Sequence, residues 1–357
     1  MKVLLSWVIA ILLLTSSKAD EPDANQVRLA YDSFVKKFKK SGGDGYALTN
    51  IGGFWQTVET TEVFIDAYER FKDDTSKQNM IDVVDSWLNA QHDNWEWNDY
   101  NDDIMWAVIM LTRSYLILGN QRYLDDAKTN FQIVWDRAWT DSYGGGLLWF
   151  KGKTTKNACV NGPGAIAACL LAIATGDDSY YNKAQDIIAW MNKMLVQQDG
   201  GVWDSIDWDS ANNKYAYNTW VSTYNQGTYI GACFLLYQHT KNNDYLDMAK
   251  RAAERSTRIS DILNGEDSGG DLIGFKGILA RWLGKLVRET GITDYNVWTQ
   301  NNARAAWNNR NSDNLMWTKF GTKTEDHIEN SNNNDKRNET SWGCSSALSW
   351  LINLAAL

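Results

Sequence analysis

Two adjacent aspartates, Asp102 and Asp103, lie in the segment "NWEWNDYNDDIMWAVIMLTRSYLILG", which runs from Asn94 to Gly119. Aromatic, amide and acidic residues precede the pair, and an apolar segment of helical character follows it. Paired carboxylates can cap a helix, bind a metal ion, or serve as the reacting groups of a hydrolase. The surroundings of the pair decide between these interpretations.

Helix capping is the simplest interpretation, because unpaired backbone amides and the helix dipole favour Asp in a first helical turn. Three observations favour a catalytic pair instead. A cap needs one carboxylate, whereas two stand here in a row. The helix is expected to belong to the inner layer of the fold, as argued below, so its first turn faces a cavity. Four aromatic residues flank the pair, namely Trp95, Trp97, Tyr100 and Trp106.

A glycosidase needs two carboxyl groups in different protonation states, about 5–5.5 Å apart in retaining enzymes and about 6.5–9.5 Å apart in inverting ones. Consecutive helical residues diverge by about 100°, which is compatible with the shorter separation. The helix dipole would keep one carboxylate ionised as the nucleophile. Repulsion and an aromatic wall would keep the other protonated as the general acid. The residues alone leave open which aspartate takes which role.

The remainder of the chain is predicted to be a helical array. Similar helix ends and starts recur around Tyr123, Tyr180 and Tyr245, and proline is nearly absent. Strand signals are few and short, around Gly146–Phe150 and Gly201–Trp203. Apolar periodicity predicts about twelve helices, over residues 25–40, 57–72, 77–92, 102–118, 121–138, 157–175, 179–197, 225–240, 244–262, 274–290, 293–309 and 343–355.

The connections between these helices alternate in length. Long ones, carrying Gly, Trp and Asp, precede each even-numbered helix, and short turns follow it. If odd and even helices are antiparallel, all even helices begin on one face, where the long loops gather. Six helix pairs closed into a ring make an (α/α)6 barrel with the even helices inside. No connection suggests a second domain.

The N-terminus predicts the compartment. A basic Lys2, an apolar run of about a dozen residues and Ser-x-Ala at 17–19 are typical of a secretory signal peptide over residues 1–19. The apolar run is too short to span a bilayer comfortably, although an uncleaved anchor is the alternative. We therefore expect a secreted protein whose catalytic domain covers residues 20–357. No later segment looks apolar enough to cross a membrane.

Composition narrows the class of partner. The formal charge is −9, and loss of Lys2 and Lys18 makes it −9 − 2 = −11. Such a chain is a poor candidate for binding nucleic acid or an anionic membrane through its charge. We expect a monomer without stable membrane insertion. The 19 tryptophans often stand beside Gly, Asn and Asp, which suits stacking on sugar rings.

Other chemistries have little support in the sequence. The three histidines, His92, His239 and His327, have no metal-ligand spacing, so we expect no metal and no other cofactor. Four cysteines leave room for one or two disulfides in an oxidising compartment, although Cys159 and Cys169 would be too far apart in one helix. Asn338-Glu-Thr fits an N-glycosylation acceptor.

The motif "YNDDIMWAV" resembles the Tyr-x-Asp-Asp-x-x-Trp-(Gly/Ala) motif of glycoside hydrolase family 76, the endo-α-1,6-mannanases. The segments "GGGLLW", "KNACVNGPGAIAA", "GGVWDSID", "TYNQGTYIGA" and "DLIGFKGILARWL" are similar to that family in the same order. The resemblance implies an (α/α)6 barrel and a retaining mechanism, with Asp102 as nucleophile and Asp103 as general acid/base. The implied substrate is α-1,6-mannan or a mannose-containing oligosaccharide.

Further candidates for substrate binding lie on the predicted loop face. They are Trp55, Tyr100, Trp106, Trp149, Asn157, Trp203, Asp204, Asp207, Tyr224, Asn225 and Gln226. Asn161 stands beside Asn157 at the start of the same helix. Helix capping is the alternative for the residues at helix starts, a loop turn for the two aspartates, and simple packing for the tryptophans. Within helices, Trp87, Trp135 and Trp190 are assigned to the core.

Two other functions remain open. Some relatives of the family resemble transglycosylases that attach glycan-anchored proteins to fungal walls and usually end in a lipid-anchor signal. Here "CSSALSWLINLAAL" has no polar spacer before its apolar tail, which favours a last inner helix. A carbohydrate-binding protein without catalysis is the other alternative, and the presence of both carboxylates argues against it.

Overall fold

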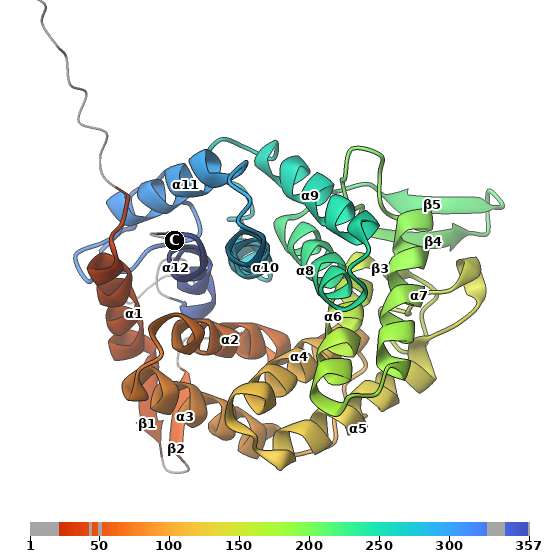
Figure 1. The fold of residues 1–357 in the computed structure, drawn as a ribbon, viewed down its shortest axis with the longest axis horizontal. Coiled ribbons are helices and arrows are strands. Elements are labelled where there is room, and N and C mark those ends of the chain that lie inside the picture. The colour runs from red at the N-terminus through yellow and green to blue at the C-terminus, as the bar shows by residue number, and fades with distance from the viewer. Residues whose placement is uncertain (1–20, 43–44, 49–51, 327–339, 356–357) are drawn as a thin grey trace, which may run out of the picture.

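A computed structural model describes residues 21–42, 45–48, 52–326 and 340–355. The predicted signal peptide and Asn338 lie outside these residues. The described chain forms two concentric rings of α-helices (Figure 1). The inner ring consists of α2 (Phe54–Phe71), α4 (Asn101–Leu118), α6 (Ala158–Thr175), α8 (Thr223–Thr240), α10 (Phe275–Thr290) and α12 (Ser341–Leu354). The outer ring consists of α1 (Ala24–Phe38), α3 (Asp74–Gln91), α5 (Gln121–Ala138), α7 (Ser179–Met194), α9 (Asn243–Thr257) and α11 (Asn296–Asn308).

Each inner helix packs against the next one along the chain, and α12 packs against α2, which closes the ring. The fold is therefore an (α/α)6 barrel, as predicted. Most predicted helix bounds lie within three residues of those observed. The largest difference is at α9, which ends at Thr257 instead of 262.

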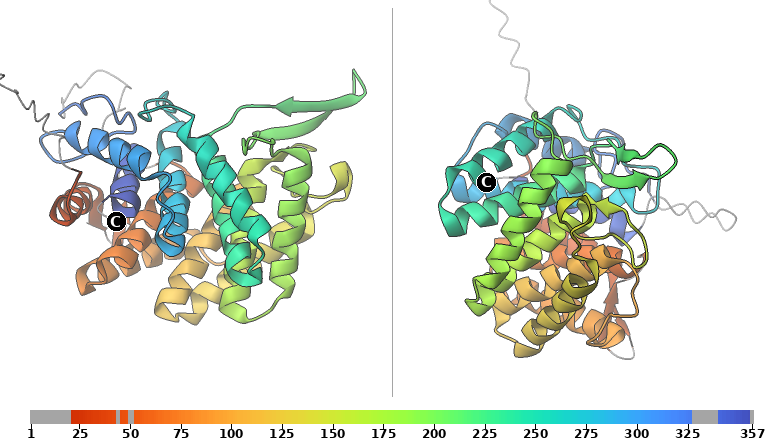
Figure 2. Two further views of the ribbon diagram at one scale, coloured as in Figure 1. Left: turned by 45° about the horizontal axis from the view of Figure 1, so that its top comes forward. Right: turned by 90° about the vertical axis from the view of Figure 1, so that its right-hand side faces the viewer.

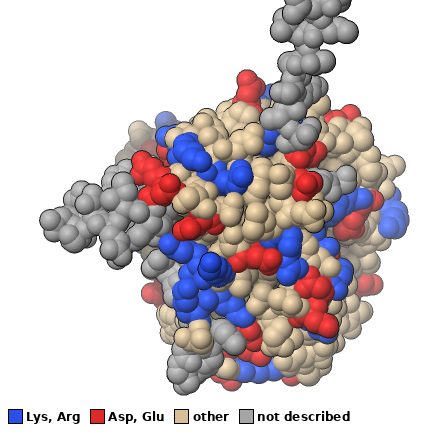
Figure 3. All heavy atoms as spheres, turned by 90° about the vertical axis from the view of Figure 1, so that its left-hand side faces the viewer, with Lys and Arg blue, Asp and Glu red and all other residues tan. Residues whose placement is uncertain are grey.

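Helix α6 corrects one expectation. Its 18 residues are long and apolar enough to cross a membrane by length and composition, whereas no segment after the predicted signal peptide was expected to be. In the structure 83% of this helix is buried inside the barrel. The outer surface of the barrel is charged, unlike this buried helix. Basic and acidic side chains are interspersed on the side of α1 (Figure 3).

Short strands occur in the connections. β1 (Lys39–Gly42) and β2 (Gly45–Leu48) form one hairpin. β3 (Lys156–Asn157), β4 (Ser205–Asp209) and β5 (Lys214–Asn218) form an antiparallel sheet in that order. The strand signals predicted around Gly146–Phe150 and Gly201–Trp203 are only isolated bridges. The β4–β5 hairpin, which projects beyond the barrel (Figure 2), was not predicted, because its alternating aromatic and polar residues make no apolar face.

Close packing of α8 against α10 depends on two glycines. A Cβ atom at Gly227 would lie 2.6 Å from the Cα of Leu279, and one at Gly231 would lie 2.4 Å from Cδ2 of Trp282. Contacts this short are not sterically allowed. The two inner helices can therefore approach as they do only because neither position carries a side chain.

A buried network of charges joins the inner helices. Helix α2 contributes Glu59, Glu62 and Asp66, α4 contributes Arg113 and α10 contributes Arg281; all are at most 3% exposed. Nη1 of Arg281 lies 2.7 Å from Oε2 of Glu59, and its Nε lies 2.9 Å from Oδ2 of Asp66. Nη2 of Arg113 lies 2.7 Å from Oδ1 of Asp66. Both oxygens of Asp66 are thus held by guanidinium groups.

The network sets the protonation of its acids. Burial works to raise the pKa of Asp66, but the charges of Arg281 and Arg113 outweigh it and the pKa is lowered. Burial raises the pKa of Glu59 to about 7, against the opposing effect of Arg281. Asp66 is therefore the ionised partner of both arginines, and its position is the most constrained in the network.

Replacing Arg281 with Met should lower the free energy of unfolding by about 3–5 kcal/mol, because Glu59 and Asp66 would stay buried without their main counter-charge. Urea denaturation at pH 7 measures this. Arg258→Met is the matched control, since Arg258 pairs with Glu254 on the surface, where both side chains are more than half exposed. The control should cost less than about 1 kcal/mol. Equal losses for the two variants would contradict the importance of the network.

Candidate active site

The two adjacent aspartates begin inner helix α4, at the end of the barrel where the long connections gather. The N-cap residue of α4 is Tyr100, and no side-chain hydrogen bond from a described residue caps the helix. Asp102 and Asp103 follow in the first turn. Capping is therefore not what places two carboxylates here.

Asp102 is held through one of its two oxygens. Its Oδ2 accepts hydrogen bonds from Nε1 of Trp149 at 3.0 Å and from Sγ of Cys159 at 3.3 Å. Its Oδ1 is buried and has no hydrogen-bond partner among the described residues. Burial, followed by the charge of Asp103, raises the pKa of Asp102 to about 8. A buried carboxylate oxygen without a partner is unusual in a folded protein and points to function.

Asp103 lies in a different environment. Its Oδ2 accepts a hydrogen bond from Nδ2 of Asn98 at 3.0 Å, and Oδ1 of Asn98 accepts one from the backbone amide of Tyr100 at 2.9 Å. Burial raises the pKa of Asp103 to about 6; Asn98 lowers it, and the charge of Asp271 adds to the rise. Asn98 and Asp271 were not among the predicted site residues, although both stand in the long connections.

A third acid lies close to the pair. The thiol of Cys159 and the hydroxyl of Tyr224 are hydrogen-bonded, and the charges of Asp102 and Asp204 act on both groups. Oδ2 of Asp204 accepts from Nδ2 of Asn218 at 3.0 Å, and burial raises its pKa. The structure thus brings together the predicted Asp102, Asp204 and Tyr224, with Cys159 between them.

Asn225 also reaches this cluster, because its Nδ2 lies 3.5 Å from Oδ1 of Asp204. Its own oxygen is buried and has no hydrogen-bond partner among the described residues. An amide oxygen in this position can accept a hydrogen bond from a ligand. Cys159, by contrast, was considered only for a disulfide, so its place beside Asp102 was missed.

Aromatic rings form one wall of the site. Trp55 donates from Nε1 to Oδ1 of Asp271 at 3.1 Å and packs edge-on against Trp342, with ring centroids 4.9 Å apart. Phe275 stacks on Tyr224, with centroids 3.8 Å apart. Trp220, which is 42% exposed, lies 6.2 Å from Phe275. Neither Trp220 nor Phe275 was predicted, because each ring's role depends on neighbours distant in sequence.

The second wall comes from the connection between α5 and α6. Trp149, which bonds to Asp102, contacts the ring of Tyr100 edge-on at 5.5 Å. Tyr100 is 42% exposed and forms part of the rim. Lys156 holds this connection, since its buried Nζ donates to the backbone oxygens of Thr140 at 2.9 Å and Ser142 at 2.6 Å. The supporting role of Lys156 carried no signal in the sequence.

Two predicted residues do not face the site. Gln226 is fully buried; its Oε1 accepts from the amide of Val202 at 2.6 Å, and its Nε2 donates to the oxygens of Gly200 and Ala252. These bonds occupy the whole amide group, so Gln226 is structural. Asn161 is likewise buried and bonds to the backbone of the α5–α6 connection.

The aromatic residues near the pair also divide into two groups. Trp95 is fully buried and packs against Trp87 and Phe54, with centroids 5.2 and 5.7 Å away, so it belongs to the core. Trp106 is buried behind Trp55, on which it stacks. It supports that ring instead of offering a surface of its own. Trp97, in contrast, is 62% exposed.

The remaining candidates lie around the three-stranded sheet. Asn157 occupies the N-cap position of α6, but its side chain caps no amide in the described chain. Its Oδ1 accepts a hydrogen bond from Oγ1 of Thr155 at 2.9 Å. Oδ1 of Asp207 accepts hydrogen bonds from Oγ1 of Thr154 at 2.8 Å and from the hydroxyl of Tyr143 at 3.3 Å. Asp207 thereby ties β4 to the α5–α6 connection.

Two further observations concern possible metal ligands and the cysteines among the described residues. They contain no group of three or more His, Cys, Asp or Glu side chains that could hold a metal ion. Cys159, Cys169 and Cys233 are buried free thiols in this part of the chain. The disulfides that the cysteine count suggested are therefore not formed by these three residues, two of which lie ten positions apart on α6.

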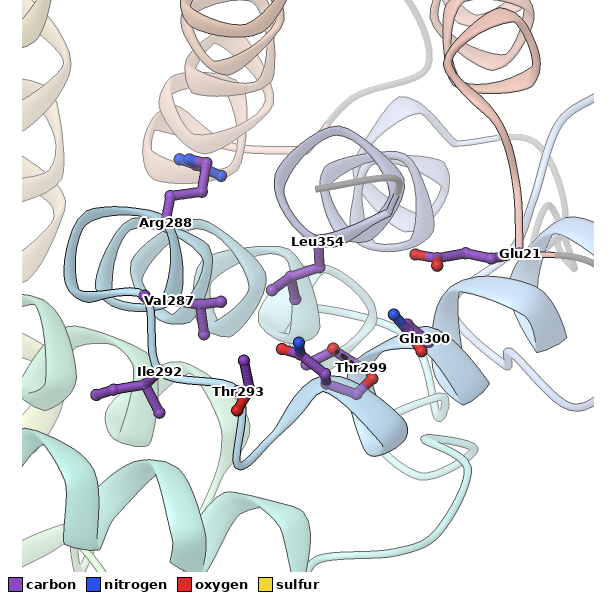
Figure 4. A pocket seen from close by; sticks show the side chains of 10 residues that line it. Glu21, Val287, Arg288, Ile292, Thr293, Thr299, Gln300 and Leu354 are labelled. Atoms are coloured by element: carbon purple, nitrogen blue, oxygen red, sulfur yellow. Dashed lines mark hydrogen bonds between the residues drawn. The ribbon is translucent and has the colours of Figure 1, made fainter.

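A hollow of about 320 Å³ lies at the other end of the barrel, between the ends of α10 and α12 and the start of α11 (Figure 4). Val287, Arg288, Ile292 and Leu354 are among its lining residues. None of the described residues that line it is aromatic, and neither Asp102 nor Asp103 is among them. The hollow is therefore separate from the candidate active site.

Residues 24–349 match the family model described as glycosyl hydrolase family 76. The chain belongs to this family. A curated relative, the mannan endo-1,6-alpha-mannosidase DCW1 of Saccharomyces cerevisiae, is 26% identical over 279 residues, which cover 69% of this chain and 60% of the yeast protein. The protein of the same name from Candida albicans is 25% identical over 221 residues, covering 57% of this chain and 47% of its own. The match thus spans less than two thirds of either relative's length.

Solved structures agree with this assignment. An inactive variant of an alpha-1,6-mannanase from Salegentibacter sp. HEL1_6, in complex with alpha-1,6-mannotriose, superposes with a TM-score of 0.79. It is 25% identical, and the match covers 92% of this chain and 98% of the bacterial one. Its inactivating changes replace two consecutive aspartates with asparagine.

The raised pKa values make a prediction about stability. A carboxyl group whose pKa is raised by folding contributes stability that is complete below its unfolded pKa, near 4, and is lost as the pH rises through its folded pKa. For Asp102 the folded pKa is about 8. Asp102→Asn should therefore raise the melting temperature, and the gain should grow between about pH 4 and pH 8.

Thermal denaturation of the variant and the unmodified protein at pH 5 and pH 8 measures this difference. Asp247→Asn, at an exposed position on α9, is the control and should change little at either pH. A gain from Asp102→Asn that is the same at both pH values would mean that the carboxyl group does not carry a raised pKa.

Proposed function

We propose that this protein is a secreted, retaining glycosidase that cleaves α-1,6-mannosidic linkages within mannan. The observation that carries the proposal is the pair Asp102 and Asp103, two neighbouring carboxyl groups with raised pKa values in an aromatic-walled site of a family 76 barrel. Secretion rests on the signal-peptide pattern of residues 1–19. N-terminal sequencing of the exported protein tests it, with Asp20 expected as the first residue.

The substrate class rests on the relatives. The two curated proteins are named as mannan endo-1,6-alpha-mannosidases, and the bacterial enzyme is an alpha-1,6-mannanase studied with alpha-1,6-mannotriose. The inactivity of its double aspartate variant supports the same roles for Asp102 and Asp103 here. Flat aromatic faces beside acids and amides, as at Trp55, Asp204 and Asn225, suit a neutral sugar with many hydroxyl groups.

In the proposed mechanism the carboxylate of Asp102 attacks the anomeric carbon of a mannose unit. The bond from that carbon to the glycosidic oxygen breaks, and Asp103 gives its proton to the departing oxygen. The Asp103 carboxylate then takes a proton from water, whose oxygen attacks the same carbon and frees Asp102. A sugar hydroxyl in place of this water would make the reaction a transglycosylation.

These roles require the proton to lie on Asp103, and burial raises the pKa of both carboxyl groups. Because the two groups are neighbours, they share one proton near neutral pH. Two donors, Trp149 and Cys159, are already placed to stabilise the ionised form of Asp102. We infer that the proton moves to Asp103 when the glycosidic oxygen arrives to accept it.

The pH dependence of kcat/KM should be bell-shaped with its maximum near neutral pH. Activity should rise as the first carboxyl group ionises through about pH 6 and fall as the second ionises through about pH 8, because one group must be charged and the other protonated. Initial rates on linear α-1,6-mannan between pH 4 and pH 10 measure the profile. A maximum near pH 4 would contradict the raised pKa values.

The roles themselves are tested by single substitutions. With linear α-1,6-mannan, both Asp102→Asn and Asp103→Asn should lower kcat by at least about a thousandfold. With an aryl α-mannoside, whose leaving group needs no protonation, Asp103→Asn should retain the first, bond-breaking step and Asp102→Asn should not. The burst of released phenol measures that step.

The anomeric configuration and size of the first products, followed by NMR, distinguish the remaining alternatives. Products of retained configuration that become shorter support hydrolysis, and longer products support transglycosylation. Asp247→Asn serves again as a control with unchanged rates. If the unmodified protein neither cleaves nor transfers mannan, the proposed function is wrong.

A further inference from the structure

The β4–β5 hairpin carries large aromatic side chains that the proposed reaction does not use. Trp208 and Tyr215 are each 42% exposed, and Tyr217 is 40% exposed. The hairpin projects from the barrel beside α7 and α9 (Figures 1 and 2). Exposed aromatic rings grouped in this way on a projecting element are a mark of a binding surface.

The strand pairing orders these rings into a row. Trp208 is directly opposite Tyr215 in the antiparallel register, and Tyr215 and Tyr217 point to the same face because side chains alternate along a strand. Ring centroids are 5.4 Å apart for Trp208 and Tyr215, and 6.4 Å apart for Tyr215 and Tyr217. Trp203 continues the row, 5.2 Å from Tyr217. We call these four residues the aromatic row.

The aromatic row is continuous with the candidate active site. Trp203 directly precedes Asp204, whose carboxylate bonds to Asn225 at the start of α8 and to Asn218 at the end of β5. The row therefore starts beside the cluster that contains Asp102 and runs outward along the hairpin. A chain-like ligand that extends from the site past Trp203 would therefore meet the row.

The hairpin is fixed to the barrel and is a preformed surface. Asp207 on β4 accepts hydrogen bonds from Thr154 and Tyr143 of the α5–α6 connection. The ring of Tyr143 also meets that of Tyr215 edge-on at 5.6 Å. Because both strands are held in this way, a ligand would not have to order the rings before binding them.

The chemistry of the row fits a neutral polysaccharide. Each sugar ring has an apolar face of C–H groups, which stacks on an aromatic ring, and a rim of hydroxyl groups, which bonds to polar side chains. The four rings supply the stacking faces, and the hydroxyl groups of Tyr215 and Tyr217 can bond to the rim. Asp207, Asp209 and Asn218 alternate with the rings along the strands and therefore point to the opposite face. A formal charge of −9 disfavours a polyanion such as a nucleic acid at this place.

We propose that the aromatic row is a remote binding site for the mannan chain, several sugar units from the point of cleavage. This rests on the proposed function for the identity of the polysaccharide. The row would hold long chains in place, so that binding energy from distant units lowers KM for the polymer. Short oligosaccharides, which fill the central site alone, would gain nothing from it.

The site is tested by comparing the kinetic constants for a long substrate with those for a short one. The double variant Trp208→Ala/Tyr215→Ala should raise KM for linear α-1,6-mannan about three- to tenfold and leave kcat and KM for mannotetraose unchanged. Val297→Ala, at a 73% exposed apolar position on α11, is the control and should alter neither substrate. Equal losses on both substrates, or no loss on either, would overturn the proposal.

Binding without catalysis separates this proposal from the proposed function. Electrophoresis of the Asp102→Asn/Asp103→Asn protein through gels containing linear α-1,6-mannan should show retardation that the hairpin substitutions reduce. A gel containing β-1,3-glucan should retard neither form. If mannan retards the double aspartate variant but the unmodified protein does not cleave mannan, the row is supported and the glycosidase is refuted. Cleavage of mannan combined with retardation insensitive to the hairpin would refute the row alone.

Discussion

Asp66 and the two guanidinium groups that enclose it hold the inner ring together. Arg113 and Arg281 bring α4 and α10 to α2, and Nδ2 of Asn353 on α12 donates to Oδ2 of Asp66 at 3.1 Å. Buried charges cost several kcal/mol each when they lack a partner, so these four helices can hardly shift past one another. The bond from Asn353 also joins α12 to α2, where the ring closes.

The contact between Arg113 and Asp66 also positions the two aspartates at the other end of α4. Arg113 and Asp102 lie eleven residues apart on this helix, which at about 1.5 Å per residue is roughly three turns. Fixing Arg113 against Asp66 fixes the rotation and height of α4, and hence which side chains its first turn presents to Trp149 and Cys159. The raised pKa values at the mouth of the barrel therefore depend on a rigid, buried network at its centre.

Much of this arrangement is predictable from the sequence, for a physical reason. Inner helices bury almost every side chain and outer helices bury one stripe, so apolar periodicity and loop length predicted the barrel and the place of Asp102 and Asp103. Contacts between distant segments were not predictable. Gln226 stands at a helix start like any sugar-binding amide, and only the folded chain shows that Val202 and Ala252 use its hydrogen bonds. Trp95 lies among polar residues in sequence and is still part of the core.

The tryptophans show why composition alone cannot locate a binding surface. Trp106, Trp282 and Trp350 are buried between helices and are explained by packing, which saves the cost of exposing a large apolar ring to water. Packing in the core does not explain Trp208, because this residue lies on the projecting hairpin and is 42% exposed. The grouping of such rings on the hairpin is instead explained by the proposed contact with a sugar chain that extends from the active site.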